Sequence, residues 1–197
     1  MKKIFLSALL ASFSFLAFSA NPHIVNVKVD SESSIIKWTG SKIASYHEGN
    51  VSIKEGALDI NHGVLSGGKF VIDMNSITCT DIESPKKNAY LVNHLKDEDF
   101  FNVASHPTAM LKITNVAKGQ GSMYKVVADL TIKGITHSIS FAADVKIKGL
   151  SYMANANIKI DRTKWDVVYK SGSVFKQLGD KIILDEIVFD ISLVSAK

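Results

Sequence analysis

Residues 126–147, VVADLTIKGITHSISFAADVKI, alternate apolar and polar side chains on both sides of Lys133-Gly134. In the runs 126–133 and 138–147, every second residue is apolar, and these residues share one face of the predicted strand. Alternation of this length is typical of antiparallel strands that bury one face, and a glycine between two such runs indicates a turn. The apolar face comprises Ala128, Leu130, Ile132, Ile139, Phe141, Ala143, Val145 and Ile147. The stretch therefore predicts two long, paired strands.

Similar patterns extend this prediction over most of the chain. Residues 187–194 alternate clearly and place Phe189 on the apolar face. Noisier alternation occupies 34–39, 51–60, 69–75, 109–116 and 156–161. The gaps between most runs are too short for crossover helices, which favours an antiparallel sheet. About eight strands of roughly ten residues favour a closed barrel over a β-sandwich, because sandwich strands are usually shorter and closure removes the sheet edges.

One segment has helical rather than strand spacing. Ser84 and Pro85 are suited to the N-cap and first position of a helix. Leu91 and Leu95 then lie four residues apart, and the helix is expected to end near Lys96. We therefore predict an all-β chain with one helical insertion.

The N-terminus, residues 1–20, has the pattern of a signal peptide. Lys2 and Lys3 precede an apolar run over 4–18, and small residues follow, so that cleavage after residue 19 or 20 is expected. An uncleaved anchor is the alternative, but fifteen residues are fewer than the about 20 that span a bilayer. The remaining residues, 21–197, have the length of one domain.

Composition narrows the function of this domain. Loss of the two leader lysines lowers the net charge from +4 to +2, and the remaining lysines are dispersed, which argues against binding to nucleic acid. No later segment is apolar and long enough to span a membrane. Cys79 is the single cysteine and is expected to be a small core residue without a disulfide partner.

Motifs for catalysis or cofactor binding are weak. The segment GVLSGGKF, 63–70, resembles a phosphate loop, but Phe70 replaces the Ser or Thr that binds magnesium. Ser-x-x-Lys, a motif of some serine enzymes, occurs five times, so a match to it does not indicate a serine hydrolase. None of the histidines shows zinc-ligand spacing; they are His23, His47, His62, His94, His106 and His137. We predict neither catalysis nor a cofactor, while histidines converging at a barrel mouth, in a metalloprotein or metal-dependent enzyme, remain the alternative.

Several segments carry a resemblance to a known family, among them the two early stretches GNVSIKEGAL (49–58) and GGKFVIDMNSI (67–77). HLKDEDFFNVASHPTAMLKIT (94–114), ADLTIKGITHSISF (128–141) and IDRTKW (160–165) resemble motifs of the YceI-like family of exported bacterial proteins. Asn102 stands where the family usually has Asp, and Trp165 where Phe is more frequent. The similarity extends over residues 27–195.

The resemblance implies a fold, a ligand and a location. It implies an extended lipocalin-like barrel in the periplasm that binds a long isoprenoid lipid, such as a polyprenol phosphate or an isoprenoid quinone, in an apolar cavity. His94, Arg162, His47 and Lys96 are candidate donors to a phosphate head group. Phe100 and Phe101 either plug the barrel or line the cavity near its entrance, and a homodimer is left open. The full set of candidate ligand-binding residues is Phe70, His94, Leu95, Phe100, Phe101, Leu130, Phe141, Arg162, Trp165 and Phe189.

Overall fold

The computed structural model describes residues 23–197, so the predicted signal peptide lies outside the described residues. These residues form nine strands, one α-helix and three short 3₁₀ helices. The strands are β1 Ile24–Lys28, β2 Ile35–Lys42, β3 Tyr46–Asn61, β4 Val64–Asp73, β5 Thr108–Lys118, β6 Met123–Ile132, β7 Ile135–Lys148, β8 Ser151–Asp161 and β9 Ile183–Val194. The helices are η1 Met74–Ser76, α1 Pro85–Lys96, η2 Arg162–Trp165 and η3 Gly179–Lys181.

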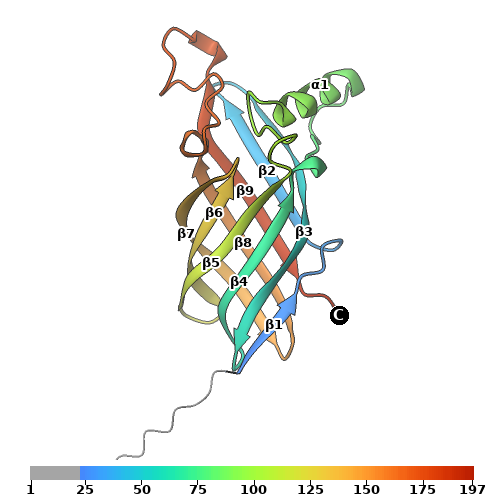
Figure 1. Ribbon diagram of the computed structural model, residues 1–197, viewed down its shortest axis with the longest axis vertical. Coiled ribbons are helices and arrows are strands. Elements are labelled where there is room, and N and C mark those ends of the chain that lie inside the picture. The colour runs from blue at the N-terminus through green and yellow to red at the C-terminus, as the bar shows by residue number, and fades with distance from the viewer. Residues whose placement is uncertain (1–22) are drawn as a thin grey trace, which may run out of the picture.

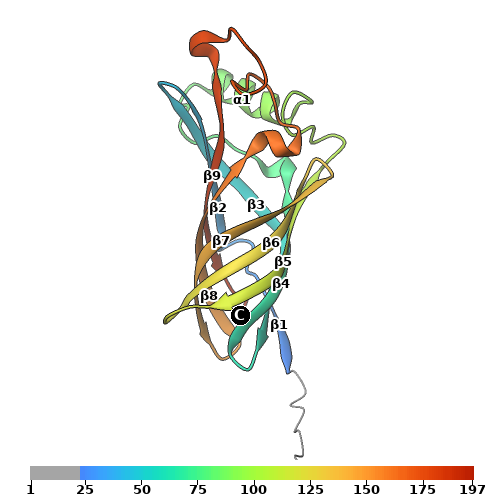
Figure 2. The same cartoon turned by 90° about the vertical axis from the view of Figure 1, so that its left-hand side faces the viewer.

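The strands close into an antiparallel barrel (Figure 1 and Figure 2). Pairing runs β2-β9-β8-β7-β6-β5-β4-β3, and β3 returns to β2. Two strands share one side of β3, because β1 pairs with residues 57–61 and β2 with residues 46–51. Nine strands therefore make an eight-stranded barrel, which confirms the predicted fold class.

The barrel core follows the predicted alternation. In β6, Val126, Ala128, Leu130 and Ile132 are buried. In β7, Ala143 and Val145 are buried, and Ile139, Phe141 and Ile147 pack against this core. The face assignments made from residues 126–147 are therefore confirmed.

Two-residue turns fix the register of two hairpins. His62 and Gly63 have φ values of 48° and 76°, and Lys133 and Gly134 have 51° and 75°. Positive φ at both central residues matches the right-handed twist of paired strands, and glycine adopts it without steric cost.

Strand boundaries were less well predicted than strand faces. The sequence patterns missed β1, a five-residue strand, and began β3 five residues late, at residue 51 instead of Tyr46. The missed part of β3 contains His47, Glu48 and Gly49, which do not alternate in polarity. There the strand is held by backbone pairing to its neighbours.

The predicted helix is confirmed as α1, which lies over one end of the barrel, called here the upper end (Figure 1). Pro85 occupies the first turn, but Ser84 makes no side-chain capping hydrogen bond, contrary to the expectation of a good N-cap. Leu95 is buried beneath the helix. No helix within residues 23–197 has the length and apolar character required to cross a bilayer.

The opposite, lower part of the barrel is packed more tightly by its own side chains. Tyr124, Val145 and Tyr152 are each at most 4% exposed there. Space inside the barrel is therefore greatest toward the upper end.

Candidate binding cavity

A cavity of about 500 Å³ occupies the upper half of the barrel. This volume lies within the roughly 300–1,000 Å³ usual for small-molecule sites. Its walls are mostly inward-facing aliphatic and aromatic side chains from the strands. They include Ile36, Trp38, Val51, Ile72, Leu111, Leu130, Ile132, Ile139, Ile158, Ile187, Phe189 and Ile191. Such walls suit an apolar ligand, because they offer few hydrogen-bonding groups.

The cavity reaches the surface at its mouth, which is bordered by the β2–β3 turn, α1 and segment 166–182. Lys42, Lys87 and Tyr90 line the cavity and are also exposed. Lys170 lines it too, and its ammonium lies 5.0 Å from the centre of the Tyr169 ring. The mouth is therefore where a ligand would enter and where its polar end would meet water.

The charged groups of this cavity are all basic. Among the described residues its lining includes Lys42, Lys87, Lys170, Arg162 and two histidines, but no Asp or Glu. Carboxylates lie just behind three of these groups, namely Asp185 at Arg162, Asp81 at His47 and Asp99 at His94, so the three lysines are the charges that act on an incoming ion. The mouth therefore favours an anion over a cation.

An aromatic cluster joins α1 to segment 166–182 across the mouth. The His94 ring meets the rings of Phe100 and Tyr169 edge-on, with centroids 5.0 and 4.8 Å away. His94 Nε2 also lies 3.0 Å from Asp99 Oδ2. Phe100 is buried and Phe101 half-buried, and both line the cavity. The segment after α1 thus closes the barrel and lines its cavity at once.

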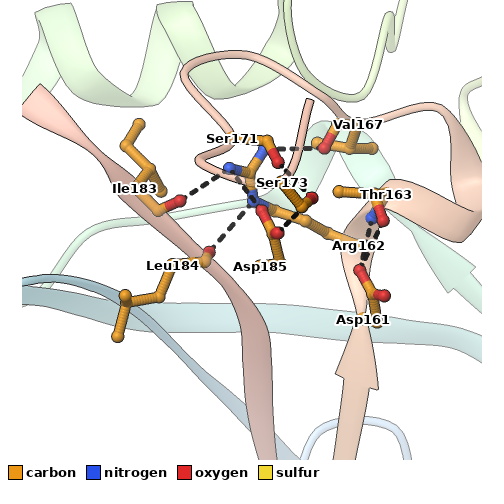
Figure 3. A network of polar contacts seen from close by, with 9 residues as sticks. All are labelled: Asp161, Arg162, Thr163, Val167, Ser171, Ser173, Ile183, Leu184 and Asp185. Carbon is orange, nitrogen blue, oxygen red and sulfur yellow. Dashed lines mark hydrogen bonds and ion pairs between the residues drawn. The ribbon is translucent and has the colours of Figure 1, made fainter. Parts of the chain in front are cut away.

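A buried polar network holds the far side of the mouth (Figure 3). Arg162 is 2% exposed and donates hydrogen bonds to the backbone oxygens of Val167, Ile183 and Leu184, at 2.6, 3.0 and 3.1 Å. Its Nη2 also lies 3.4 Å from Asp185 Oδ1. Burial lowers the pKa of Arg162, while Asp185 and Asp161 oppose this shift. The guanidinium is therefore engaged chiefly in tying segment 166–182 to β9.

Two serines complete the network. Ser171 is fully buried, and its hydroxyl lies 2.8 Å from that of Ser173. Ser173 donates to Asp185 Oδ2 at 2.6 Å. Segment 166–182, which has little regular structure of its own, is thereby held in one place.

Seven of the ten predicted ligand-binding residues line this cavity. They are His94, Leu95, Phe100, Phe101, Leu130, Arg162 and Phe189. Phe70 and Phe141 line a second cavity of about 90 Å³ deeper in the barrel. Trp165 lines neither; it is 1% exposed and donates a hydrogen bond to the Leu130 backbone oxygen at 3.0 Å. Contact of any of these residues with a ligand stays a prediction.

The candidates for binding a head group are dispersed. His47 lines the cavity, and its Nδ1 lies 2.8 Å from Asp81 Oδ2. Lys96 does not line it and donates to the Asn75 backbone oxygen at 2.6 Å. Sequence reasoning missed Lys42, Lys87 and Lys170, which come from three distant segments and share no motif.

Metal-binding geometry has no support in residues 23–197. Within that range no group of three or more His, Cys, Asp or Glu side chains is placed to share an ion. His47 and His94 each pair instead with a single carboxylate, that of Asp81 and Asp99 respectively.

Comparison with known proteins identifies the domain. The family model of the YceI-like domain matches residues 27–194. The chain belongs to the YceI-like family. This confirms the resemblance carried by segments such as 94–114, 128–141 and 160–165.

Two relatives of this YceI-like domain are UPF0312 proteins. A UPF0312 protein of Shewanella denitrificans is 26% identical over 145 residues, which cover 73% of each chain. A UPF0312 protein of Yersinia pestis is 31% identical over 98 residues, which cover 46% of this chain and 47% of that protein.

Solved structures share the YceI-like fold at low sequence identity. BcnA of Burkholderia cenocepacia has a TM-score of 0.68 at 20% identity, covering 85% of this chain and 99% of that one. A polyisoprenoid binding domain from Saccharophagus degradans has a TM-score of 0.63 at 16% identity, covering 89% and 98%. A YceI protein of Campylobacter jejuni has a TM-score of 0.52 at 18% identity, covering 100% and 99%. At these identities the likeness shows the fold alone.

Proposed function

We propose that the mature chain is an exported, periplasmic carrier that holds a long-chain isoprenoid lipid. The cavity holds as much of the tail as its volume allows, and the polar head remains at the mouth. The observation that carries this proposal is the cavity itself, with mostly apolar walls and basic residues at its mouth. The polyisoprenoid-binding domain of the same fold supports an isoprenoid as the ligand class.

The energetics of an apolar tail support binding in this cavity. Removing apolar surface from water contributes about 25 cal/mol per Å². Part of this offsets the loss of translational and rotational freedom on association. A tail that fills the cavity therefore leaves enough free energy for stable binding, and it would otherwise be insoluble in an aqueous compartment.

The head group distinguishes the two candidate lipids. Lys42, Lys87 and Lys170 line the mouth without a carboxylate among the lining residues of the described chain. Ammonium groups bind phosphate as point charges. A polyprenol phosphate therefore fits this mouth better than an isoprenoid quinone, whose head carries no charge.

Binding rather than catalysis is the proposed role. Most polar atoms of the network around Arg162, Ser171 and Asp185 contact one another or the backbone, while Asp185 Oδ1, which lies 3.4 Å from Arg162 Nη2, makes no hydrogen bond within residues 23–197. The hydroxyls and carboxylate of that network thus have a structural use. The alternative of a metal-dependent enzyme gains no observation in its favour from residues 23–197.

Native mass spectrometry of protein purified from its own envelope tests the proposal. We expect a bound species that organic extraction identifies as an isoprenoid, and a protein mass that places the N-terminus after residue 19 or 20. Polyprenyl phosphate, neutral polyprenol and an isoprenoid quinone would then be added to emptied protein in separate arms. Preferential uptake of the phosphate is expected; uptake of none of the three would refute the proposal.

A pair of variants on β7 provides the control. Ile139 lines the cavity, whereas Ser140, the next residue, is exposed on the outer face. Ile139→Trp should fill part of the cavity and reduce lipid uptake, while Ser140→Trp should leave uptake unchanged.

A further inference from the structure

Exposed apolar side chains gather around the mouth. Three segments that border it each present such side chains to solvent: the β2–β3 turn with the first residue of β3, α1, and the chain from η2 into the start of β9. These segments lie together at the upper end in both views (Figure 1 and Figure 2). The side chains are Ile43, Tyr46, Tyr90, Val174, Phe175 and Leu184, which are 62%, 58%, 73%, 50%, 46% and 42% exposed. Exposed apolar side chains grouped at one end of a protein are typical of an interaction site.

Lysines accompany each of these segments. Lys42 precedes Ile43, and Lys176 follows Phe175. Lys86 and Lys87 lie one helical turn before Tyr90 on α1. Acidic residues lie near Phe175, since Glu98, Asp99 and Asp166 line a shallow hollow that Phe175 also lines, so the positive charge of this end is carried chiefly by the lysines of the β2–β3 turn and α1. Apolar side chains flanked by lysines are the combination that binds at the surface of a membrane containing anionic lipid.

This surface is continuous with the cavity. Tyr90 and Leu184 are exposed and also line the cavity, as do Lys42 and Lys87. An apolar ligand leaving the cavity therefore passes directly over these side chains. Any partner that covers them also covers the path of the ligand.

We propose that the mouth end docks on the surface of an anionic phospholipid bilayer. Ile43, Val174 and Phe175 insert among the head groups, and the neighbouring lysines contact the lipid phosphates. The lipid ligand then moves between bilayer and cavity without exposing its tail to water. This inference rests on the proposed function for its purpose, but the docking itself is measurable separately.

The lower end offers a matched control. Met123, Leu150 and Met153 are 44%, 66% and 57% exposed, which closely matches the three inserting side chains. Lysines accompany them as well, at Lys125 and Lys148. Buried side chains such as Tyr124 and Tyr152 lie in the barrel beneath them, and none of the three lines the cavity of about 500 Å³.

The test is flotation of the mature protein with vesicles of phosphatidylcholine and phosphatidylglycerol, and with vesicles of phosphatidylcholine alone. We expect the protein to bind the anionic vesicles, with affinity that falls as salt is raised. The triple variant Ile43→Ser, Val174→Ser, Phe175→Ser should lose about tenfold or more in vesicle affinity. The triple variant Met123→Ser, Leu150→Ser, Met153→Ser should bind as the wild type does.

Thermal unfolding confirms that both triple variants are folded, and native mass spectrometry measures their lipid uptake. Since Ile43, Val174 and Phe175 do not line the cavity, uptake from detergent should be unchanged in the mouth variant. Equal vesicle binding by both variants, or no vesicle binding by the wild type, overturns the docking proposal. Vesicle binding by a wild type that takes up no isoprenoid would instead leave docking in place and refute the proposed function.

Discussion

At the scale of single residues, two glycines on neighbouring strands show how the space around a glycine decides whether alanine can replace it. Gly49 pairs with Trp38 across β2 and β3, and the Trp38 indole donates to the Thr78 backbone oxygen at 3.1 Å. A Cβ at position 49 would overlap that oxygen and lie 2.9 Å from Cys79 Cα. A Cβ at Gly40 meets nothing within 4 Å.

Gly49→Ala is therefore expected to lower the free energy of unfolding by about 2–3 kcal/mol, because backbone must move to relieve the overlap. Gly40→Ala should change it by less than about 1 kcal/mol. Urea denaturation of both variants measures the difference. Equal changes in the free energy of unfolding would show that the backbone after η1 can move away from the new Cβ without loss of stability.

Tyr152 carries a buried hydroxyl that finds no hydrogen-bond partner among residues 23–197. Burial raises the pKa of Tyr152 to about 12. The folded state thus favours the neutral phenol. The contribution of Tyr152 to the free energy of unfolding is complete below pH about 10, and it is lost as the pH rises through the pKa of Tyr152 in the folded state.

Tyr152→Phe should be neutral or stabilising, by up to about 1 kcal/mol at pH 7, because it removes an unpaired polar group without changing shape. The variant should also lose less stability than the wild type between pH 10 and 12. Thermal unfolding across this range checks both statements; a clear loss at pH 7 would mean that the hydroxyl has a partner.

At the scale of elements, a side chain from η2 ties segment 166–182 to the barrel, in addition to hydrogen bonds within the segment such as that from Phe175 N–H to the Ser171 backbone oxygen. Arg162 reaches backbone oxygens on both sides of the segment, at Val167 and at Ile183 and Leu184. The planar guanidinium can satisfy these oxygens together, whereas an ammonium cannot.

Arg162→Lys should therefore destabilise the domain by about 2–3 kcal/mol and expose segment 166–182 to protease. Lys164→Gln, at an exposed position of the same 3₁₀ helix, serves as the control. Limited proteolysis with mass analysis locates the first cut. A first cut elsewhere in the Arg162→Lys variant would show that other contacts hold the segment.

At the scale of the whole molecule, the two cavities are separated by a shared belt of side chains. The belt lines both cavities and consists of Ile36, Ile72, Leu111, Ile158 and Ile191. If each carbon takes up roughly the 30 Å³ of a water molecule, about three or four five-carbon isoprene units fill the upper cavity. The belt then limits how much of a tail the barrel can enclose.

Leu111→Ala should join the two cavities and shift preference toward prenols longer by about one isoprene unit, given the ~30 Å³ taken for each carbon. Leu193→Ala, which enlarges only the lower cavity, should not shift it. Competition among prenols of graded length, followed by native mass spectrometry, reads out the preference. An identical length profile in Leu111→Ala and wild type would show that the belt already opens for the tail.

The amino-acid sequence by itself determined the barrel and its inner face. Alternation in segments such as 126–147 assigns each side chain to the core or to solvent, because successive residues of a strand point to opposite faces. The helix over 85–96 followed from its cap residues and four-residue spacing. These are local properties, so the sequence displays them directly.

The tertiary structure alone decided what surrounds the mouth. Lys42, Lys87 and Lys170 meet there because strand register and barrel closure bring three distant segments together. Closure also committed Arg162 to backbone oxygens and left Gly49 no room for a side chain. No local sequence pattern predicts these contacts, since they depend on strand pairing between residues far apart in the chain.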